Sequence, residues 1–229
     1  MLLGIKTKPM KNHCDFEFDN QFLKIEGIKY LPWIGKQALE KNQRLLIIGE
    51  SVHNWGKEDD ERKAAQIRLE KNDFARVVAY EHGIDNPNPK RIFARNIERT
   101  LADDFENKND RINFWESILF HELVQRPLAH KKVRPTKSDY DNGSKVLTSI
   151  MQITKPNKCV FLGTTWAKFA GLKNSLELNY TIEEKHFGKI NGANPKTILI
   201  KELNTKVYFI KHPSSFFSPE LWKDFIEKN

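Results

Sequence analysis

Apolar runs long enough for buried strands recur along the chain and alternate with segments of helical periodicity. The runs are RLLIIGE (44–50), ILFHELVQ (118–125), KCVFLG (158–163), KTILIKEL (196–203) and TKVYFIKH (205–212). Continuous runs of this kind are typical of strands that are covered on both faces. The last two are separated by a short polar turn, so they are candidates for direct pairing.

Apolar positions at helical spacing lie between these runs. They predict helices over 59–80, 90–101, 144–154 and 164–171, a helical start at NFWESI (113–118), and a last helix at SPELWKDFIEK (218–228) with Ser218 as its cap and Pro219 at its first position. Strands that alternate with helices indicate an α/β fold. We expect a three-layer α/β/α sandwich with a central, mainly parallel sheet.

The two ends of this pattern suggest one domain and a short appendage. Residues 1–43 show no sustained period, apart from a possible short helix in LPWIGKQALEKN (31–42), and are predicted to form a peripheral N-terminal arm. Residues 44–229 are predicted to form the domain. Within it, RPLAHKKVRPTKSDYDNG (126–143) is polar, basic and interrupted by two prolines, which predicts a long loop.

The most unusual polar clusters directly follow the strand candidates. They are GESVHNW (49–55), HELVQRP (121–127), GTTW (163–166) and HPSSFF (212–217). In sheets with parallel strands, ligands bind beyond the carboxyl ends of the strands. The clusters therefore predict one site at that edge.

The net charge and the number of cysteines favour some classes of binding partner and metal site and exclude others. The chain has 38 Lys and Arg against 30 Asp and Glu, a net charge of +8, which suits a polyanion such as DNA, although scattered surface charge would give the same total. Two cysteines are too few for a disulfide framework, a four-cysteine zinc site or an iron–sulfur cluster. No apolar run reaches the length of a membrane span. We expect a cytoplasmic monomer without metal or cofactor.

The first cluster offers Glu50, Ser51, His53 and Asn54 as candidate catalytic residues, with Trp55 next to them as a candidate base contact. An ordinary loop whose side chains cap the next helix would look the same. The cluster lacks the glycine spacing of a dinucleotide or P-loop site. Metal binding through Glu50 and His53 is an alternative, but two ligands do not make a site.

His121 and Glu122 are neighbours on a strand, so their side chains should face opposite sides of the sheet. One of them can be structural. An ionised Glu122 has only acceptors, so it could bind the amino group of a ligand.

The last cluster combines a histidine with serines and two aromatic residues. Ser214 and Ser215 can donate to phosphates, and Phe216 with Phe217 can form an apolar wedge between bases. The alternative is that both phenylalanines pack on Trp222 and the core.

Taken in this order, the clusters resemble the motifs of the uracil-DNA glycosylase superfamily, over roughly residues 44–222. GESVHN is similar to the loop that positions or activates water, ILFHELVQRP to the strand that carries the base-reading residue, and HPSSFFSPELW to the closing motif whose next residue inserts into DNA. KPNKCVFLGTTWAKF is similar to the stretch before that motif. Val52 replaces a proline of the most similar branch, and Ser51 stands where the strongest catalysts have aspartate.

The resemblance implies a DNA glycosylase that flips a base and hydrolyses its N-glycosidic bond. His212 would stabilise negative charge on the departing base, Phe216 would fill the vacated space, and Glu122, or less favourably His121, would read the base. With aspartate missing, Glu50 is the first candidate for activating water. Ionised Glu122 can accept hydrogen bonds but cannot donate one. We therefore expect it to bind the amino group of a cytosine-derived base rather than the C4 carbonyl of uracil.

DNA contacts are expected from the serines and phenylalanines of the last cluster, from Thr164, and from the basic loop residues Lys131, Lys132, Arg134 and Lys137. Two other functions stay open. One is a base-binding or DNA-binding module of the same fold with weak or no catalysis. The other is a nucleoside or nucleotide hydrolase.

Overall fold

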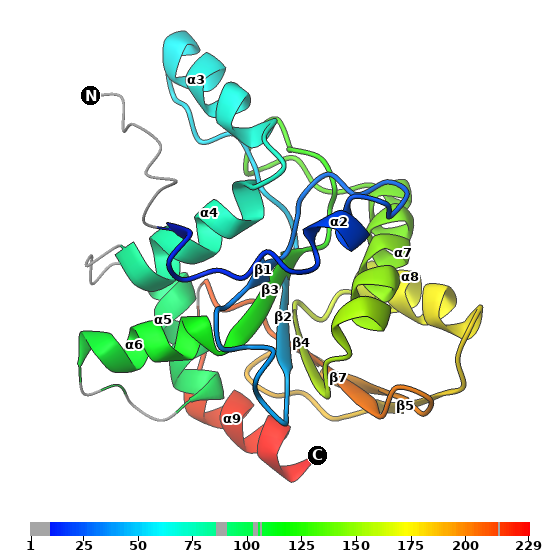
Figure 1. The fold of residues 1–229 in the computed structure, drawn as a ribbon. Coiled ribbons are helices and arrows are strands. Elements are labelled where there is room, and N and C mark those ends of the chain that lie inside the picture. The colour runs from blue at the N-terminus through cyan, green and yellow to red at the C-terminus, as the bar shows by residue number, and fades with distance from the viewer. Residues whose placement is uncertain (1–9, 86–90, 103–104, 106, 215) are drawn as a thin grey trace.

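A seven-stranded mixed sheet organises the chain, with helices on both of its faces (Figure 1). The computed structural model describes residues 10–85, 91–102, 105, 107–214 and 216–229. The strand order is β1-β3-β2-β4-β7-β6-β5. The strands are β1 (Trp33–Ile34), β2 (Leu45–Gly49), β3 (Ile118–Glu122), β4 (Lys158–Leu162), β5 (Ile182–His186), β6 (Lys196–Ile200) and β7 (Thr205–Ile210).

The central four strands, β3, β2, β4 and β7, run parallel, whereas β1, β6 and β5 pair antiparallel at the edges. The α/β class is therefore confirmed, with a sheet that is parallel at its centre and mixed overall. The predicted pairing of the last two apolar runs is also confirmed, because β6 and β7 lie side by side in antiparallel register. The strand β5, whose side chains are mostly exposed, had no signal in the apolar pattern.

Helices cover the sheet in two groups. The first group has α4 (Phe74–Tyr80), the π-helix η1 (Glu81–Asp85), α5 (Ile92–Leu101), α6 (Lys108–Glu116) and α9 (Pro219–Lys228). The helix α3 (Asp59–Leu69) projects beyond the sheet above α4 in Figure 1, and its Leu69 packs in a small separate cluster with Phe74. The second group has α7 (Lys137–Thr154) and α8 (Trp166–Glu177), which pack on the opposite face, and the short helix α2 (Asp19–Phe22) lies near them. Among the described residues, no helix is both long and apolar enough to pass through a bilayer.

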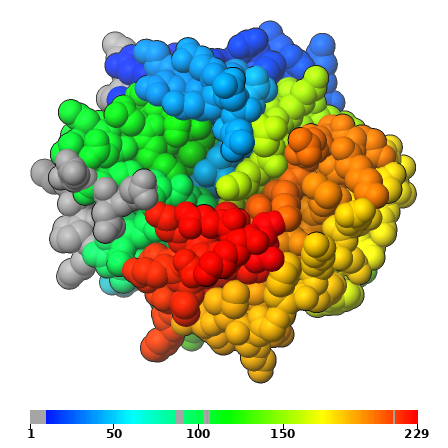
Figure 2. Space-filling model, turned by 90° about the horizontal axis from the view of Figure 1, so that it is seen from below, coloured from blue at the N-terminus to red at the C-terminus, as the bar shows by residue number. Residues whose placement is uncertain are grey.

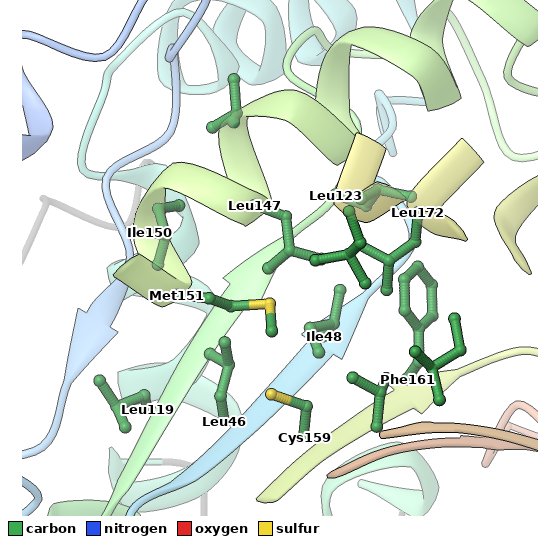
Figure 3. Packing of buried hydrophobic residues seen from close by; sticks show 14 of the residues in the cluster. Leu46, Ile48, Leu119, Leu123, Leu147, Ile150, Met151, Cys159, Phe161 and Leu172 are labelled. Atoms are coloured by element: carbon green, nitrogen blue, oxygen red, sulfur yellow. The ribbon is translucent and has the colours of Figure 1, made fainter. Parts of the chain in front are cut away.

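The core between the sheet and α7 consists of large aliphatic side chains. Figure 3 shows Leu46, Ile48 and Leu119 from the strands pointing toward Leu147 and Met151 of α7. All five are fully buried. At about 25 cal/mol per Å² of apolar surface, such side chains supply most of the driving force that holds a helix layer on a sheet.

The described part of the predicted N-terminal arm belongs to this core and sheet. Strand β1 pairs with β3 through Trp33 and Phe120, and Phe22, Tyr30 and Trp33 are completely buried. The Nε1–H of Trp33 donates to the carbonyl of Trp115 at 2.9 Å. Residues 10–42 are thus not peripheral. The sequence pattern missed them because a two-residue strand and single buried aromatics have no measurable period.

The predicted long basic loop is shorter than expected, because α7 begins at Lys137. Thr136 caps this helix: its hydroxyl accepts from the backbone N–H of Asp139, and the Asp139 carboxylate accepts from the N–H of Thr136. This reciprocal arrangement is a capping box. Gly143 lies inside the helix, where a Cβ would lie 2.1 Å from the carbonyl oxygen of Leu123. Close packing therefore explains a glycine that the sequence had suggested as a loop residue.

Candidate functional site at the carboxyl ends of the parallel strands

The loop after β2 is held against the loop after β3 by backbone hydrogen bonds that continue the sheet. The N–H of Leu123 donates to the carbonyl of Gly49, and that of Val124 donates to the carbonyl of Glu50. Farther along, the N–H of Leu128 donates to Val52. These bonds give the first polar cluster a defined backbone, so Glu50 is presented from a rigid element.

Glu50 is the centre of a cluster of polar side chains. Its carboxylate accepts from the hydroxyl of Tyr140 at 2.7 Å and from the guanidinium of Arg134 at 3.0 Å, and lies 3.0 Å from the Nζ of Lys168. Burial alone would raise the pKa of Glu50, but the charge of Lys168 and the hydrogen bonds from Tyr140 and Lys168 outweigh it and hold this pKa below its usual value. Glu50 is therefore an ionised carboxylate of reduced basicity.

Lys168 is the residue of this cluster that the sequence did not identify. Its side chain is only 3% exposed, and its Nζ also donates to the carbonyl of Leu162 at 3.3 Å. Gly163 makes room for it: a Cβ there would lie 2.2 Å from this Nζ, and the φ of Gly163 is +137°. Burial lowers the pKa of Lys168, and the neighbouring Glu50 opposes that shift. One signal was available, because Lys168 lies four residues before buried Leu172 on the inner side of α8.

Glu122 lies across from Gly49 in the β2–β3 register, and its carboxyl group occupies the space that a side chain at Gly49 would fill. The residue is 5% exposed, and its Oε2 has no hydrogen-bond partner among the described residues. Burial raises the pKa of Glu122, and the negative charge of Glu50 adds to the effect, to about 8. At neutral pH Glu122 is thus a carboxylic acid that can donate as well as accept.

His121 faces the other side of the sheet, as the alternation of strand side chains predicts. It is completely buried, and its Nε2 lies 3.2 Å from the amide nitrogen of Gln125. Burial lowers the pKa of His121 to about 3, so the imidazole is neutral. The structure therefore keeps His121 away from the Glu50 cluster and in the core.

His212 follows β7, and its Nδ1 lies 2.9 Å from the hydroxyl of Ser214. Its ring contacts that of Phe93 at a centroid distance of 5.5 Å. Burial lowers the pKa of His212, and the nearby positive charges of Lys168 and Arg134 add to this, to about 4. The charge of Glu50 acts in the opposite direction. The imidazole is thus neutral at pH 7 and lies within electrostatic reach of the first glycine loop.

The two phenylalanines of the last cluster have different environments. Phe216 is 91% exposed with a φ of +48°, and its carbonyl accepts from the Nζ of Lys211 at 2.8 Å. Phe217 stacks on buried Trp222 at 6.2 Å and joins the core. The alternative of packing on Trp222 therefore holds for Phe217, and Phe216 is the ring that meets solvent. Ser215 lies outside the described residues.

Several other candidate residues of the first cluster make contacts within their own loop or with its neighbours. Asn54 accepts from the N–H of Gly56 and donates to the carbonyl of Arg62, and Trp55, 49% exposed, stacks on Phe74. His53 pairs with Leu128 through backbone, and its side chain is exposed at the surface. Partial loss of solvent around its ring, and then the charge of Lys131, lower the pKa of His53. Ser51 is half-buried beside Glu50. These residues shape the loop around Glu50.

Some of the predicted DNA-binding cations are free at the surface, and others already pair with a carboxylate of the protein. Lys131 and Lys132 are exposed at the loop surface. Arg134 is exposed as well but forms an ion pair with Glu50 at 3.0 Å, and Lys137 forms an ion pair with Asp141 at 2.5 Å on the first turn of α7. The carbonyl of Thr164 accepts from Lys196. Only the first two, therefore, present a surface charge that phosphates could bind without first replacing a protein partner.

A shallow depression of about 200 Å³ lies at the opposite end of the sheet, between the starts of β2 and β4 and helix α9. Figure 2 views the molecule from that end, with α9 in red. Its lining includes Leu45, Lys158 and Ile226 and lacks the polar groups described above. We therefore assign the candidate site to the carboxyl ends of the strands on its chemistry. Within the described residues, no three His, Cys, Asp or Glu side chains come close enough to hold a metal ion.

No protein-family model matches this chain, and no curated protein matches it either. Its function therefore has to be inferred from these residues.

Proposed function

We propose that this protein is a DNA glycosylase of the uracil-DNA glycosylase type, built on that family's three-layer α/β/α sandwich. The observation that carries the proposal is the convergence of Glu50, Glu122 and His212. They come from three different strand ends, and the charge of Glu50 acts on the pKa values of both Glu122 and His212. Phe216 is exposed four residues beyond His212. An enzyme that acts on a base must extrude it and fill the gap, and an exposed phenylalanine suits the second task.

The proposed reaction breaks the bond between C1′ of the sugar and the ring nitrogen of the base. The bonding electrons leave with the base, and the oxygen of a water molecule bonds to C1′. The proton that this oxygen loses is taken up by the departing base, which leaves in its neutral form. Neutral His212 can donate an N–H to a carbonyl oxygen of the departing base, because Ser214 can hydrogen-bond its other ring nitrogen. The carboxylate of Glu50 carries the negative charge that would stabilise the cationic sugar and orient the water.

Glu122 would read the edge of the extruded base. A neutral carboxyl group donates one hydrogen bond and accepts another, as an amide does, so it can bind a pyrimidine that carries a carbonyl group at C4. The ionised form only accepts and would favour an amino group. The preference for a cytosine-derived base that the sequence suggested depends on the ionised form, so both classes of base remain substrates to compare.

We expect the specificity to change with pH. The pKa of Glu122 is about 8. The ratio of cytosine-type to uracil release should therefore be higher at pH 9 than at pH 7, by roughly tenfold for one repulsive contact replaced by a favourable one. The measurement is the rate of base release from duplexes that contain uracil, cytosine or a modified cytosine, with the free base identified by mass. Release of no base from any duplex at either pH would contradict the glycosylase proposal.

The Glu50→Gln variant is expected to lower the rate of base release by roughly 10²-fold, since general-base and charge effects of one group reach this size. Binding of DNA should be unchanged. Glutamine keeps an acceptor for Tyr140 but removes the charge that balances Lys168, so thermal unfolding has to be measured in parallel. The double variant Glu50→Gln/Lys168→Met removes both buried charges and serves as the folding control. A rate equal to that of the wild type would exclude Glu50.

The low basicity of Glu50 favours one alternative, a module that binds an extruded base without cleaving its bond. Three donors already hold this carboxylate, and its pKa is below the usual value. The two functions are separated by searching treated DNA for abasic sites. Base binding without any abasic product would identify the module.

A further inference from the structure

A second exposed aromatic side chain, Trp166, lies at the same edge of the sheet as His212. It is the first residue of α8, directly after the loop that follows β4, and is 64% exposed. Its ring packs against Phe169 at 5.4 Å and lies 6.4 Å from the ring of His186 in β5. The indole is thus supported from below by aromatic groups while most of it meets solvent.

Hydrogen bonds connect the segments that carry Trp166 and His186 to the loop that carries Phe216. The Nζ of Lys196 donates to the carbonyls of Thr164 and Asn194 at 3.0 and 3.3 Å, and so ties the start of α8 to the loop between β5 and β6. The Nζ of Lys211 donates to the carbonyls of Asn191 and Phe216, both at 2.8 Å. The segments 164–166, 191–196 and 211–214, together with Phe216, therefore form one rim from Trp166 to Phe216.

The rim beside Trp166 offers one lysine for a phosphate. On the face of β5 that carries His186, the carboxylate of Glu184 is neutralised by Lys173 at 2.9 Å. The alternation of strand side chains turns Lys185 to the opposite face. Lys189, in the loop that follows β5, is exposed and forms no ion pair with a described residue. An exposed aromatic ring with a nearby lysine suits a base and its neighbouring phosphate.

We propose that Trp166 and His186 form a stacking platform for an unpaired nucleotide of the DNA strand, a few nucleotides from the extruded one, with Lys189 contacting its phosphate. This inference rests on the proposed function, because it takes the strand to enter at Phe216. It specifies a single-stranded or locally opened substrate. Stacking on an aromatic ring tolerates any base, so the platform adds affinity without sequence preference.

The test is binding of a fluorescein-labelled single-stranded oligonucleotide of one normal base, measured by fluorescence anisotropy. Trp166→Ala should weaken binding roughly tenfold, and Trp166→Phe by less, since one base–aromatic stack contributes about this much. Leu178→Ala is the matched control, because Leu178 is 73% exposed at the other end of α8 and should leave binding unchanged. Replacing Lys189 with Ala should reduce the dependence of affinity on salt.

The outcomes separate this inference from the proposed function. If no duplex releases a base but Trp166→Ala still weakens single-strand binding, the platform stands and the glycosylase proposal fails. If the protein releases a base and Trp166→Ala binds single strands as tightly as the wild type, the platform is overturned. An equal loss in the Leu178→Ala variant, or a wild-type protein that does not bind single strands, would overturn it as well.

Discussion

The Glu122→Gln variant is expected to remove a loss of stability that the wild-type protein suffers as pH rises. The pKa of Glu122 is about 8 in the folded protein, above its usual value of 4.5. Between these two pH values the folded state binds a proton that the unfolded state does not. The free energy of unfolding of the wild type therefore falls from about pH 4.5 to pH 8.

The size of this effect follows from the shift. One unit of pKa corresponds to about 1.4 kcal/mol, so the contribution of Glu122 should differ by roughly 3–5 kcal/mol between pH 5 and pH 9. Urea unfolding of both proteins at the two pH values measures it. The stability of the variant relative to wild type should increase by that amount from pH 5 to pH 9. Titrating groups whose pKa does not depend on Glu122, such as His121, are present in both proteins and cancel in this comparison.

An exposed carboxylate provides the control for the measurement. Glu227→Gln, on the solvent side of α9, should leave the pH dependence of stability as it is in the wild type. If Glu122→Gln behaves in the same way, Glu122 is ionised in the folded protein. It would then act as an acceptor only, and the cytosine-derived base would become the favoured substrate.

The His212→Ala variant is expected to lose most of the base-release activity, roughly 10²–10³-fold in a single-turnover rate, because it removes a donor aimed at the charge that develops on the departing base. Because its pKa is about 4, the neutral imidazole would be the active form. The wild-type rate should therefore not fall as pH rises through 6.5, as it would if an imidazolium were required.

The matched control for this variant is His82→Ala, a substitution of an exposed histidine in η1. It should retain the wild-type rate, and both variants should bind DNA. Thermal unfolding checks that the loss of the contact between His212 and Phe93 has not altered the fold. A His212→Ala rate within threefold of wild type would remove His212 from the mechanism.

The strands at the centre of the fold could be predicted from the sequence because each of them is buried on both faces. Such strands need a continuous apolar run, and β2, β4 and β7 all have one. The polar residues that end these runs had to meet at one edge once the strands were parallel. The positions of Glu50, Glu122 and His212 at this edge are predictable from the sequence in this way.

The remainder of the site depends on contacts between distant segments, which local patterns do not encode. In the sequence, Lys168 looks like an ordinary lysine of a surface helix. Its Nζ can reach Leu162 and Glu50 only because Gly163 has no side chain. Arg134 reads as a loop cation, yet it pairs with a carboxylate 84 residues away. The capping box at Thr136, by contrast, was visible in the sequence and would have placed the start of α7 correctly.

The sequence by itself determined which residues stand at the strand ends and that the centre of the sheet is parallel, because burial and alternation act over a few neighbouring positions. Only the tertiary structure decided the charge that each of those residues carries. Glu122 is neutral because it is buried beside Glu50, and Glu50 is ionised because Lys168 and Arg134 lie next to it. Charge states follow from desolvation and from nearby charges, and both are properties of the folded chain.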